Sequence, residues 1–360
     1  MPRVVEDGLE APTRKSDRLP WGWLLAGLLI GSGFSVLLFR VDVVSIPTET
    51  TFAGQENDIG PQQGIADVIV GFPDGLVATV RAGGRSLGIL TWPLRGASYE
   101  EALPVGASTP SDPVAFDYSG QQMATLLPVP DQSLGVLYAG VPEIASIVAL
   151  DVTGFAWHDS SPLDLAYTTF EGDELLLWVT RGPLADLELV ARSVGIDGRI
   201  AAWGDWGFAV EDEEKGSIVL FTESGEIKDT HPGRVLASSA DGWLAIDNDG
   251  ISLLSAGGGV KGLDRPGLAG DILTGGLSAD GAFLGLLTTD GILVVALDDD
   301  SELIQLGARP GVPQLTWSSD SRFVSYPGLR GIVVLDTVDW GVDEILETHI
   351  ITGLGVLPLS

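Results

Sequence analysis

Short apolar runs alternate with small polar turn clusters along most of this chain. Each cluster ends one apolar run and is followed at once by the next. Seven clusters follow this pattern, the last one listed being a degenerate copy: Asp74-Gly75, Ser119-Gly120, Ser160-Ser161-Pro162, Asp241-Gly242, Asp280-Gly281, Asp320-Ser321 and Asp205-Trp206-Gly207. Their mean spacing is about 41 residues, which is the period of a four-stranded propeller blade. The pattern therefore predicts one repeating body.

The apolar runs predict strands rather than helices. Each run is about five residues long, the usual length of a strand. Asp-Gly pairs between such runs are typical of tight hairpins, because both central residues of a type I′ turn need positive φ. No segment after residue 60 has a sustained helical period. We predict that residues 61–360 form an all-β, seven-bladed β-propeller whose fourth blade is the least regular. The apolar tail 349–357 is expected to pair with the first or last blade, because a closed ring leaves no long open edge.

One turn sequence resembles a known family. Residues 315–326 read LTWSSDSRFVSY and look like the blade motif of TolB-type propellers, which is Trp-Ser-Pro-Asp-Gly, two further residues and an apolar run. Similar or looser copies lie at 277–284, 239–244, 116–120 and 157–161. The family's usual Pro is absent at Ala240, Ala279 and Ser319. The resemblance covers about residues 61–347. It implies a fold whose Asp-Gly turns are structural, and it transfers no ligand.

The N-terminal region differs from the rest of the chain. Residues 21–39 read WGWLLAGLLIGSGFSVLLF, an uncharged run long enough to cross the ~30 Å hydrocarbon core as a helix. Basic residues precede this run and acidic residues follow it. The positive-inside rule then places the N-terminus in the cytoplasm and the large body outside the cell membrane.

We therefore predict a disordered cytoplasmic tail over 1–19, a transmembrane helix over 20–40 that contacts the lipid bilayer, and a linker over 41–60. A cleaved signal peptide is the alternative, although no small-x-small site follows the apolar run.

Charge and cysteine content exclude several classes of function. The chain carries 19 Lys and Arg against 50 Asp and Glu, a formal net charge of -31. Nucleic acid is not an expected partner, because phosphate binding needs clustered Lys and Arg. Cysteine is absent, which excludes disulfides, thiolate metal sites and thiol nucleophiles. An acidic surface that confers solubility is the simplest explanation of the charge.

Several motifs suggest chemistry but have simpler structural explanations. The segment 84–88 matches Gly-x-Ser-x-Gly, yet a nucleophile elbow needs a strand followed by a helix, and this one lies between two expected strands. The three histidines, at 158, 231 and 349, have no metal-ligand spacing. The acidic groups 247–250 and 298–302 could bind calcium, but 247–250 lacks the spacing of an EF-hand loop and 298–302 lies in an expected loop between blades. We predict no cofactor, no metal site and no catalytic residues.

Five residues are the best candidates for contact with a ligand or partner. Trp206 breaks its turn motif and is expected to be exposed, whereas most other tryptophans are expected to fill the core between blades. His158 is placed at an inner turn and could face the central channel. The three others belong to the run 211–214, which is expected to be a solvated hairpin loop: Glu211, Asp212 and Glu213.

Three functions are compatible with these features. The first is a non-enzymatic, membrane-anchored extracytoplasmic propeller that binds a protein or another component of the cell envelope. The alternative is a propeller enzyme that acts on glycans through carboxylates about 5–10 Å apart in the central channel. The third is a sensor that signals through the helix, which would need a cytoplasmic partner because the tail has only about 19 residues.

Overall fold

The computed structural model describes residues 74–357 with fourteen interruptions, at 83–85, 93–99, 105–113, 130–133, 142–144, 183–186, 240–241, 248–249, 256–258, 264–270, 298–302, 307–309, 330 and 347–349. The predicted tail 1–19, membrane helix 20–40 and linker 41–60 lie outside the described residues. So do most of the two acidic groups considered for calcium. Within the described part of the chain, no helix is long and apolar enough to cross a membrane.

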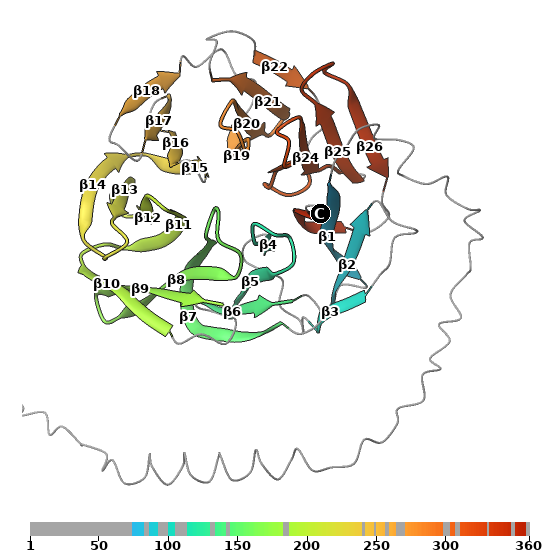
Figure 1. Cartoon of the computed structure of the whole chain (residues 1–360). Coiled ribbons are helices and arrows are strands. Elements are labelled where there is room, and N and C mark those ends of the chain that lie inside the picture. The colour runs from blue at the N-terminus through green and yellow to red at the C-terminus, as the bar shows by residue number, and fades with distance from the viewer. Residues whose placement is uncertain are drawn as a thin grey trace, which may run out of the picture. The chain divides into compact units, whose positions relative to one another are not determined.

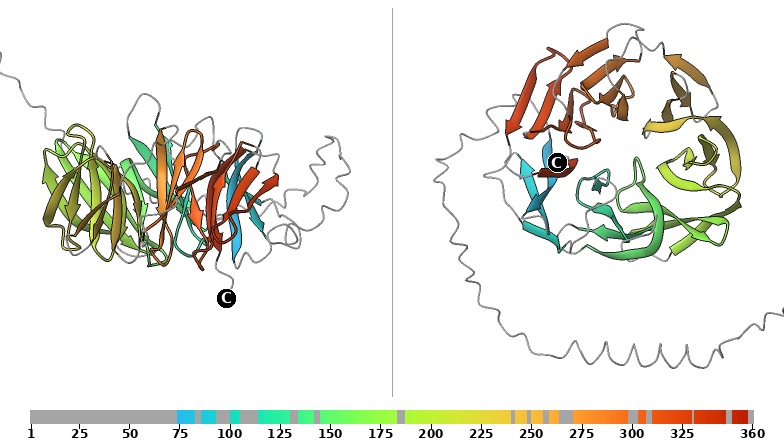
Figure 2. Two further views of the ribbon diagram at one scale, coloured as in Figure 1. Left: turned by 90° about the horizontal axis from the view of Figure 1, so that it is seen from above. Right: turned by 180° about the vertical axis from the view of Figure 1, so that it is seen from behind.

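All regular elements of the described residues are strands. They form 27 strands in six antiparallel sheets, five with four strands and one with seven. The prediction of an all-β body is thus confirmed for these residues. Figure 1 shows the sheets following one another around a ring, with β4, β11, β15 and β19 toward the centre and β10, β14, β18 and β22 toward the rim. Figure 2 shows the same ring from the side and from behind.

Four sheets each consist of four strands that are consecutive in sequence. The first two are β11–β14 (Gly198–Gly204, Gly207–Asp212, Ser217–Phe221, Ile227–Pro232) and β15–β18 (Arg234–Ser238, Trp243–Asp247, Ile251–Ser255, Val260–Leu263). The next two are β19–β22 (Ile272–Leu277, Phe283–Thr288, Gly291–Ala296, Leu303–Leu306) and β23–β26 (Thr316–Trp317, Phe323–Pro327, Gly331–Asp336, Val342–Leu346). The fourth repeat, expected to be irregular, therefore forms the complete sheet β11–β14. Its hairpin Gly204–Gly207 replaces the missing turn motif.

The seven-stranded sheet contains two repeats joined by one long strand. Its order is β4 to β10, with bounds Ala115–Phe116, Met123–Pro128, Gly135–Gly140, Ser146–Trp157, Asp164–Glu171, Glu174–Arg181 and Leu187–Val194. The twelve-residue strand β7 pairs with β6 as far as Val152, and from Val152 onward it pairs with β8. It is thus the outer strand of a β4–β7 half and the inner strand of a β7–β10 half.

The ends of the described chain meet in the sixth sheet. Its order is β27-β1-β2-β3, with bounds Ile350–Leu357, Gly75–Ala82, Ser86–Trp92 and Glu100–Pro104. The prediction that the tail 349–357 pairs with an end blade is therefore confirmed for β27. Gln314 holds this strand from the neighbouring sheet, since its amide donates to the Leu354 carbonyl at 3.0 Å and accepts from the Leu354 N–H at 2.9 Å.

Large aromatic side chains fill the wedges between adjacent sheets, as expected for the tryptophans. Trp317 stacks on Phe283 with ring centroids 6.0 Å apart and donates to the Gly276 carbonyl of the next sheet at 2.9 Å. Trp157 donates in the same way to Ala115 at 3.2 Å. These N–H groups would be costly to bury without a partner. Trp317 therefore fixes one sheet against the next, and Trp157 fixes the two halves of the seven-stranded sheet against each other.

The strand order defines two faces of the ring. In each repeat the inner strand turns into the second strand on one face, which we call the turn face. Because the strands are antiparallel, the turn from the third to the outer strand lies on the turn face as well. The connection from the second to the third strand lies on the opposite face.

Candidate functional site

The regular turns on the turn face are closed by their own side chains. Ser318 donates to Asp320 Oδ1 at 2.6 Å and accepts from the Phe323 N–H at 2.9 Å. Ser278 makes the same pair of bonds, at 2.7 Å to Asp280 and at 2.9 Å from the Phe283 N–H. The Asp of each motif is thus structural, as the resemblance implied.

His158 takes the place of this serine in the β7–β8 turn. Its Nδ1 accepts from the backbone N–H groups of Ser160 and Ser161, at 3.2 and 3.1 Å. Nδ1 is therefore an acceptor, and the proton of the neutral ring lies on Nε2. The ring is 5% exposed and packs edge-on against Trp203, with centroids 4.6 Å apart. Burial lowers the His158 pKa, although nearby carboxylates act in the opposite direction.

The Nε2 side of His158 faces two carboxylates on the turn face. Asp205 Oδ1 lies 3.5 Å from Nε2, and Glu223, from the β13–β14 turn, completes a group whose polar atoms all lie within 4.8 Å of one another. Both carboxylates are exposed. Among the described residues neither of them forms an ion pair with Lys or Arg. The group is thus a local concentration of negative charge with which no described Lys or Arg forms an ion pair, although Arg181 lies near enough to lower the pKa of His158.

This group does not suit a metal ion. A histidine that binds a metal through one ring nitrogen normally donates an N–H from the other. The other nitrogen of His158 already accepts two backbone N–H groups, so it cannot carry that proton without displacing them. The arrangement instead presents an N–H and two carboxylates to the solvent.

Asp159 links three sheets beneath these carboxylates. Its N–H donates to the Trp203 carbonyl at 3.0 Å, and its Oδ1 accepts from Ser238 at 2.9 Å. A Cβ added at Gly204 would lie 3.1 Å from the Asp159 Oδ2 and close to the indole Nε1 of Trp206, and both buried atoms lack a hydrogen-bond partner among the described residues. Burial raises the Asp159 pKa to about 7, against the lowering effects of Ser238 and Trp206.

Trp206 is not the exposed side chain that the broken motif predicted. It is half-buried and packs against the apolar cluster of Ala209, Leu244 and Leu254. The correction has a local reason. The two-residue hairpin between Gly204 and Gly207 turns the indole back over the sheet, and a Cβ at Gly204 would lie only 2.5 Å from its Nε1.

The three acidic candidates lie on the opposite face, at the other end of β12. Glu211 and Asp212 belong to this strand rather than to a solvated loop, which begins only at Glu213. Glu211 accepts from the Val235 N–H at 2.7 Å. Asp212 is 1% exposed and pairs with Lys215 Nζ at 2.6 Å. The prediction of a solvated 211–214 loop is therefore wrong for the first two residues, because strand pairing continues through them.

The structure thus separates the predicted site residues into two groups. His158 and Trp206 come together on the turn face, and the acidic residues lie on the opposite face. Sequence reasoning missed Asp159 and Glu223, which join the first group. Asp159 could have been singled out as the one turn residue that follows a histidine instead of a serine, but the position of Glu223 depends on the fold.

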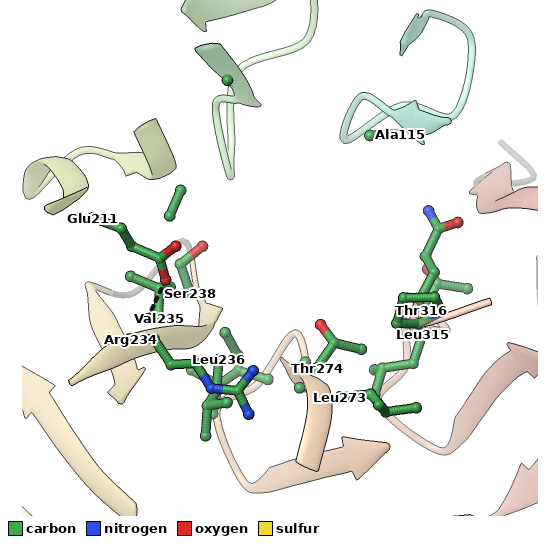
Figure 3. Close-up of a pocket in the computed structure, with 18 of the residues that line it drawn as sticks. Ala115, Glu211, Arg234, Val235, Leu236, Ser238, Leu273, Thr274, Leu315 and Thr316 are labelled. Atoms are coloured by element: carbon green, nitrogen blue, oxygen red, sulfur yellow. Dashed lines mark hydrogen bonds between the residues drawn. The ribbon is translucent and has the colours of Figure 1, made fainter. Parts of the chain in front are cut away.

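A channel runs through the centre of the ring (Figure 3). Its cavity of about 640 Å³ is lined mainly by the inner strands, including the whole of β15 from Arg234 to Ser238. Glu211 is the one carboxylate among the described lining residues, and it also lies 3.7 Å from Arg199. The other polar lining residues include Arg199, Arg234 and Thr274, so charged and hydrogen-bonding groups are mixed with small and apolar ones along the wall.

Four-stranded antiparallel sheets set radially around such a channel define a β-propeller. No protein-family model matches the chain, and no curated protein matches it. Several solved structures do resemble it.

A functionally unknown protein from Desulfotomaculum acetoxidans is 9% identical, over 79% of this chain and 98% of that one, with a TM-score of 0.55. A protein from Lactobacillus plantarum is 10% identical, over 79% and 99%, with a TM-score of 0.52. TolB from Acinetobacter baumannii is 13% identical, over 82% and 69%, with a TM-score of 0.48. At these identities the first two likenesses show the fold alone.

Proposed function

We propose that this protein is a seven-bladed, TolB-like propeller that acts as a binding module for a protein of the cell envelope. The blade count follows if the seven-stranded sheet is taken as two blades that share β7. Five four-stranded sheets then bring the total to seven. The TolB-like character is supported by the Ser-x-Asp turns at Ser278 and Ser318, which close in the way the resemblance implied.

One observation carries the binding function. Asp205 and Glu223 form an exposed pair of carboxylates beside the His158 N–H, and no described Lys or Arg balances them. Interfaces are steered by complementary charge, so this pair favours a basic partner surface. The overall charge of -31 favours the same class of partner.

The membrane anchor is the second part of the proposal. Residues 20–40 would hold the protein in the cell membrane, with the N-terminal tail in the cytoplasm and the propeller outside. The length of the apolar run and the basic residues before it support this topology.

The enzyme alternative has less support. A glycan-acting site would need two carboxylates facing each other in the channel. Of the described lining residues, only Glu211 is a carboxylate, and it is bonded to the Val235 N–H. No specific observation favours a second function.

Site-specific photo-crosslinking in native membranes tests the binding function. A photoreactive amino acid is placed at Ser224, which is exposed in the β13–β14 turn beside Glu223. A matched control is placed at Asp173, which is exposed on the opposite face. We expect Ser224, but not Asp173, to capture one reproducible envelope protein by mass spectrometry, and the double variant Asp205→Asn, Glu223→Gln to reduce its yield.

The proposal fails if no protein is captured from the turn face, or if capture is equal from both faces. Turnover of a glycan or peptide panel by the purified protein would favour the enzyme alternative instead.

A further inference from the structure

A second pocket lies on the turn face, where the β4–β7 half meets the β7–β10 half. Its cavity is about 170 Å³. Small-molecule pockets usually span roughly 300–1,000 Å³, so this one is sized for a single side chain. The wall is mostly apolar and includes Val148, Trp157, Leu163 and Leu165.

A glutamine side chain lines the pocket. Gln122 lines the cavity and is 7% exposed. Its backbone is satisfied by Asp117, since its N–H donates to Oδ1 at 2.9 Å and its carbonyl accepts from the Asp117 N–H at 3.0 Å. Its side-chain amide forms no hydrogen bond with the described residues. Because Gln122 lines the cavity, its amide is free to bond to a group that enters the pocket.

The rim of the pocket is strained. Leu163 has φ 73° and remains 37% exposed, and its carbonyl accepts from the Gly182 N–H at 3.0 Å. A non-glycine residue in the left-handed region is uncommon, and such strain is concentrated at binding sites. The rim thus holds the side chain of Leu163 at the pocket's edge, in a backbone conformation that leucine rarely adopts.

The unbalanced carboxylates lie on the same face. Trp157 lines the pocket, and the next residue, His158, belongs to the group with Asp205 and Glu223. The two sites lie at the same end of β7 but on opposite sides of it, since Trp157 packs with the apolar cluster of β5–β8 and His158 packs against Trp203. A ligand that covers both would meet an apolar cavity, a primary amide and a concentration of negative charge.

We propose that this pocket anchors a linear segment of a partner protein. One large apolar side chain of the segment fills the cavity, and the peptide group of that residue pairs with the Gln122 amide. A primary amide can do this because it both donates and accepts, as a peptide group does. A basic residue of the same segment meets Asp205 and Glu223. This inference rests on the proposed function, since it names the partner chemistry of the same face.

Designed peptides bound to the full-length protein test the anchor. Twelve-residue peptides carry a central Leu or Phe flanked by Lys, and matched peptides carry a central Ala or flanking Glu. Fluorescence anisotropy measures their affinity. We expect the Lys-flanked apolar peptides to bind at least tenfold more tightly than either matched set, with a difference from the Glu set that decreases as salt rises.

The variant Gln122→Leu separates binding from folding. It removes an amide without a partner, so the protein should unfold at the same or a higher temperature. Peptide affinity should nevertheless fall roughly 3- to 10-fold, the effect of losing one or two hydrogen bonds. The control is Gln121→Leu, at the exposed neighbour outside the pocket, which should change neither quantity.

Equal binding of all peptides, no binding at all, or unchanged affinity in Gln122→Leu would overturn the anchor. If photo-crosslinking from Ser224 still captured an envelope protein whose yield did not depend on Gln122, the anchor would be wrong while the binding function remained.

Discussion

Two kinds of turn follow the inner strands of this propeller, and they differ in where their polar groups find partners. In the β19–β20 and β23–β24 turns, Ser278 and Ser318 bond to residues two and five positions away. In the β7–β8 turn, Asp159 bonds to Trp203 and Ser238, which belong to two other sheets. The first kind is closed by its serine within the turn, although Asp280 and Ser319 also bond to adjacent sheets, whereas the carboxylate of the second kind bonds only across sheets.

We expect function at the second kind of turn, the β7–β8 turn. A locally closed turn satisfies its own polar groups and leaves nothing for a ligand. The β7–β8 turn replaces the serine with His158 and buries Asp159, and exposed Asp205 and Glu223 lie beside it without an ion pair to any described Lys or Arg. The irregular turn thus combines a buried titratable group with unbalanced surface charge.

The largest effect should come from pH. The Asp159 pKa rises from 3.8 in the unfolded chain to about 7 in the folded protein. Between these values the folded protein binds more protons than the unfolded chain, so stability should fall as pH rises from about 4 to about 7. The full rise corresponds to about 4 kcal/mol, and because Asp159 keeps some solvent contact we expect about 2–4 kcal/mol. Urea unfolding at successive pH values measures this slope.

Asp159→Asn is the control for the pH effect. It keeps an acceptor for Ser238 and cannot ionise, so the difference in stability between the two proteins isolates Asp159. The difference is needed because burial lowers the pKa of His158, which makes stability rise with pH below 6.5. If the stability of the two proteins changed equally between pH 4 and 7, the ionisation of Asp159 would contribute nothing to the free energy of unfolding.

The next effect compares one serine from each kind of turn. Ser318 is 1% exposed, and Ser318→Ala would leave the buried Phe323 N–H without its acceptor. Such a loss costs about 2–3 kcal/mol. Ser160→Ala should cost less than about 0.5 kcal/mol, because Ser160 binds His158 through its backbone N–H, while its hydroxyl lies at 3.4 Å. Equal losses of stability in Ser318→Ala and Ser160→Ala, measured by urea unfolding, would show that the serine hydroxyl has the same role in both turns.

The turns that a serine closes are the part of the fold that the sequence could predict best. The Ser-x-Asp turns close within six residues, so a short motif was enough to predict them and, through their spacing, the all-β repeat. The candidate His158 was found because the repeat placed it at an inner turn, after Trp157. Trp206 was expected to be exposed because the sequence does not show which way a two-residue hairpin turns its side chain.

The rest of the site depends on contacts between sheets. Glu223 comes within 4.8 Å of His158 only because β13 ends on the same face as β7. The burial of the Gln122 amide depends on the meeting of two halves of one sheet. No local pattern carries this information, whereas the pairing of β27 with β1 could be predicted because ring closure is a general requirement.

The smallest effect concerns a single backbone conformation within the locally closed turns. Ser321 has φ 63°, where the equivalent residues are Gly281 at 69° and Gly242 at 83°. Its hydroxyl also accepts from the Asp280 N–H of the adjacent sheet at 2.9 Å. Ser321→Ala loses this hydrogen bond and keeps the strained φ, so it should cost about 1 kcal/mol. Ser321→Gly loses the same bond but removes strain worth about 1 kcal/mol, and should leave stability within about 0.5 kcal/mol of the original. Urea unfolding of the two variants measures the difference between them, which should be about 1 kcal/mol in favour of Gly. Equal stability of the two variants would mean that the positive φ at this position costs a residue with a Cβ nothing.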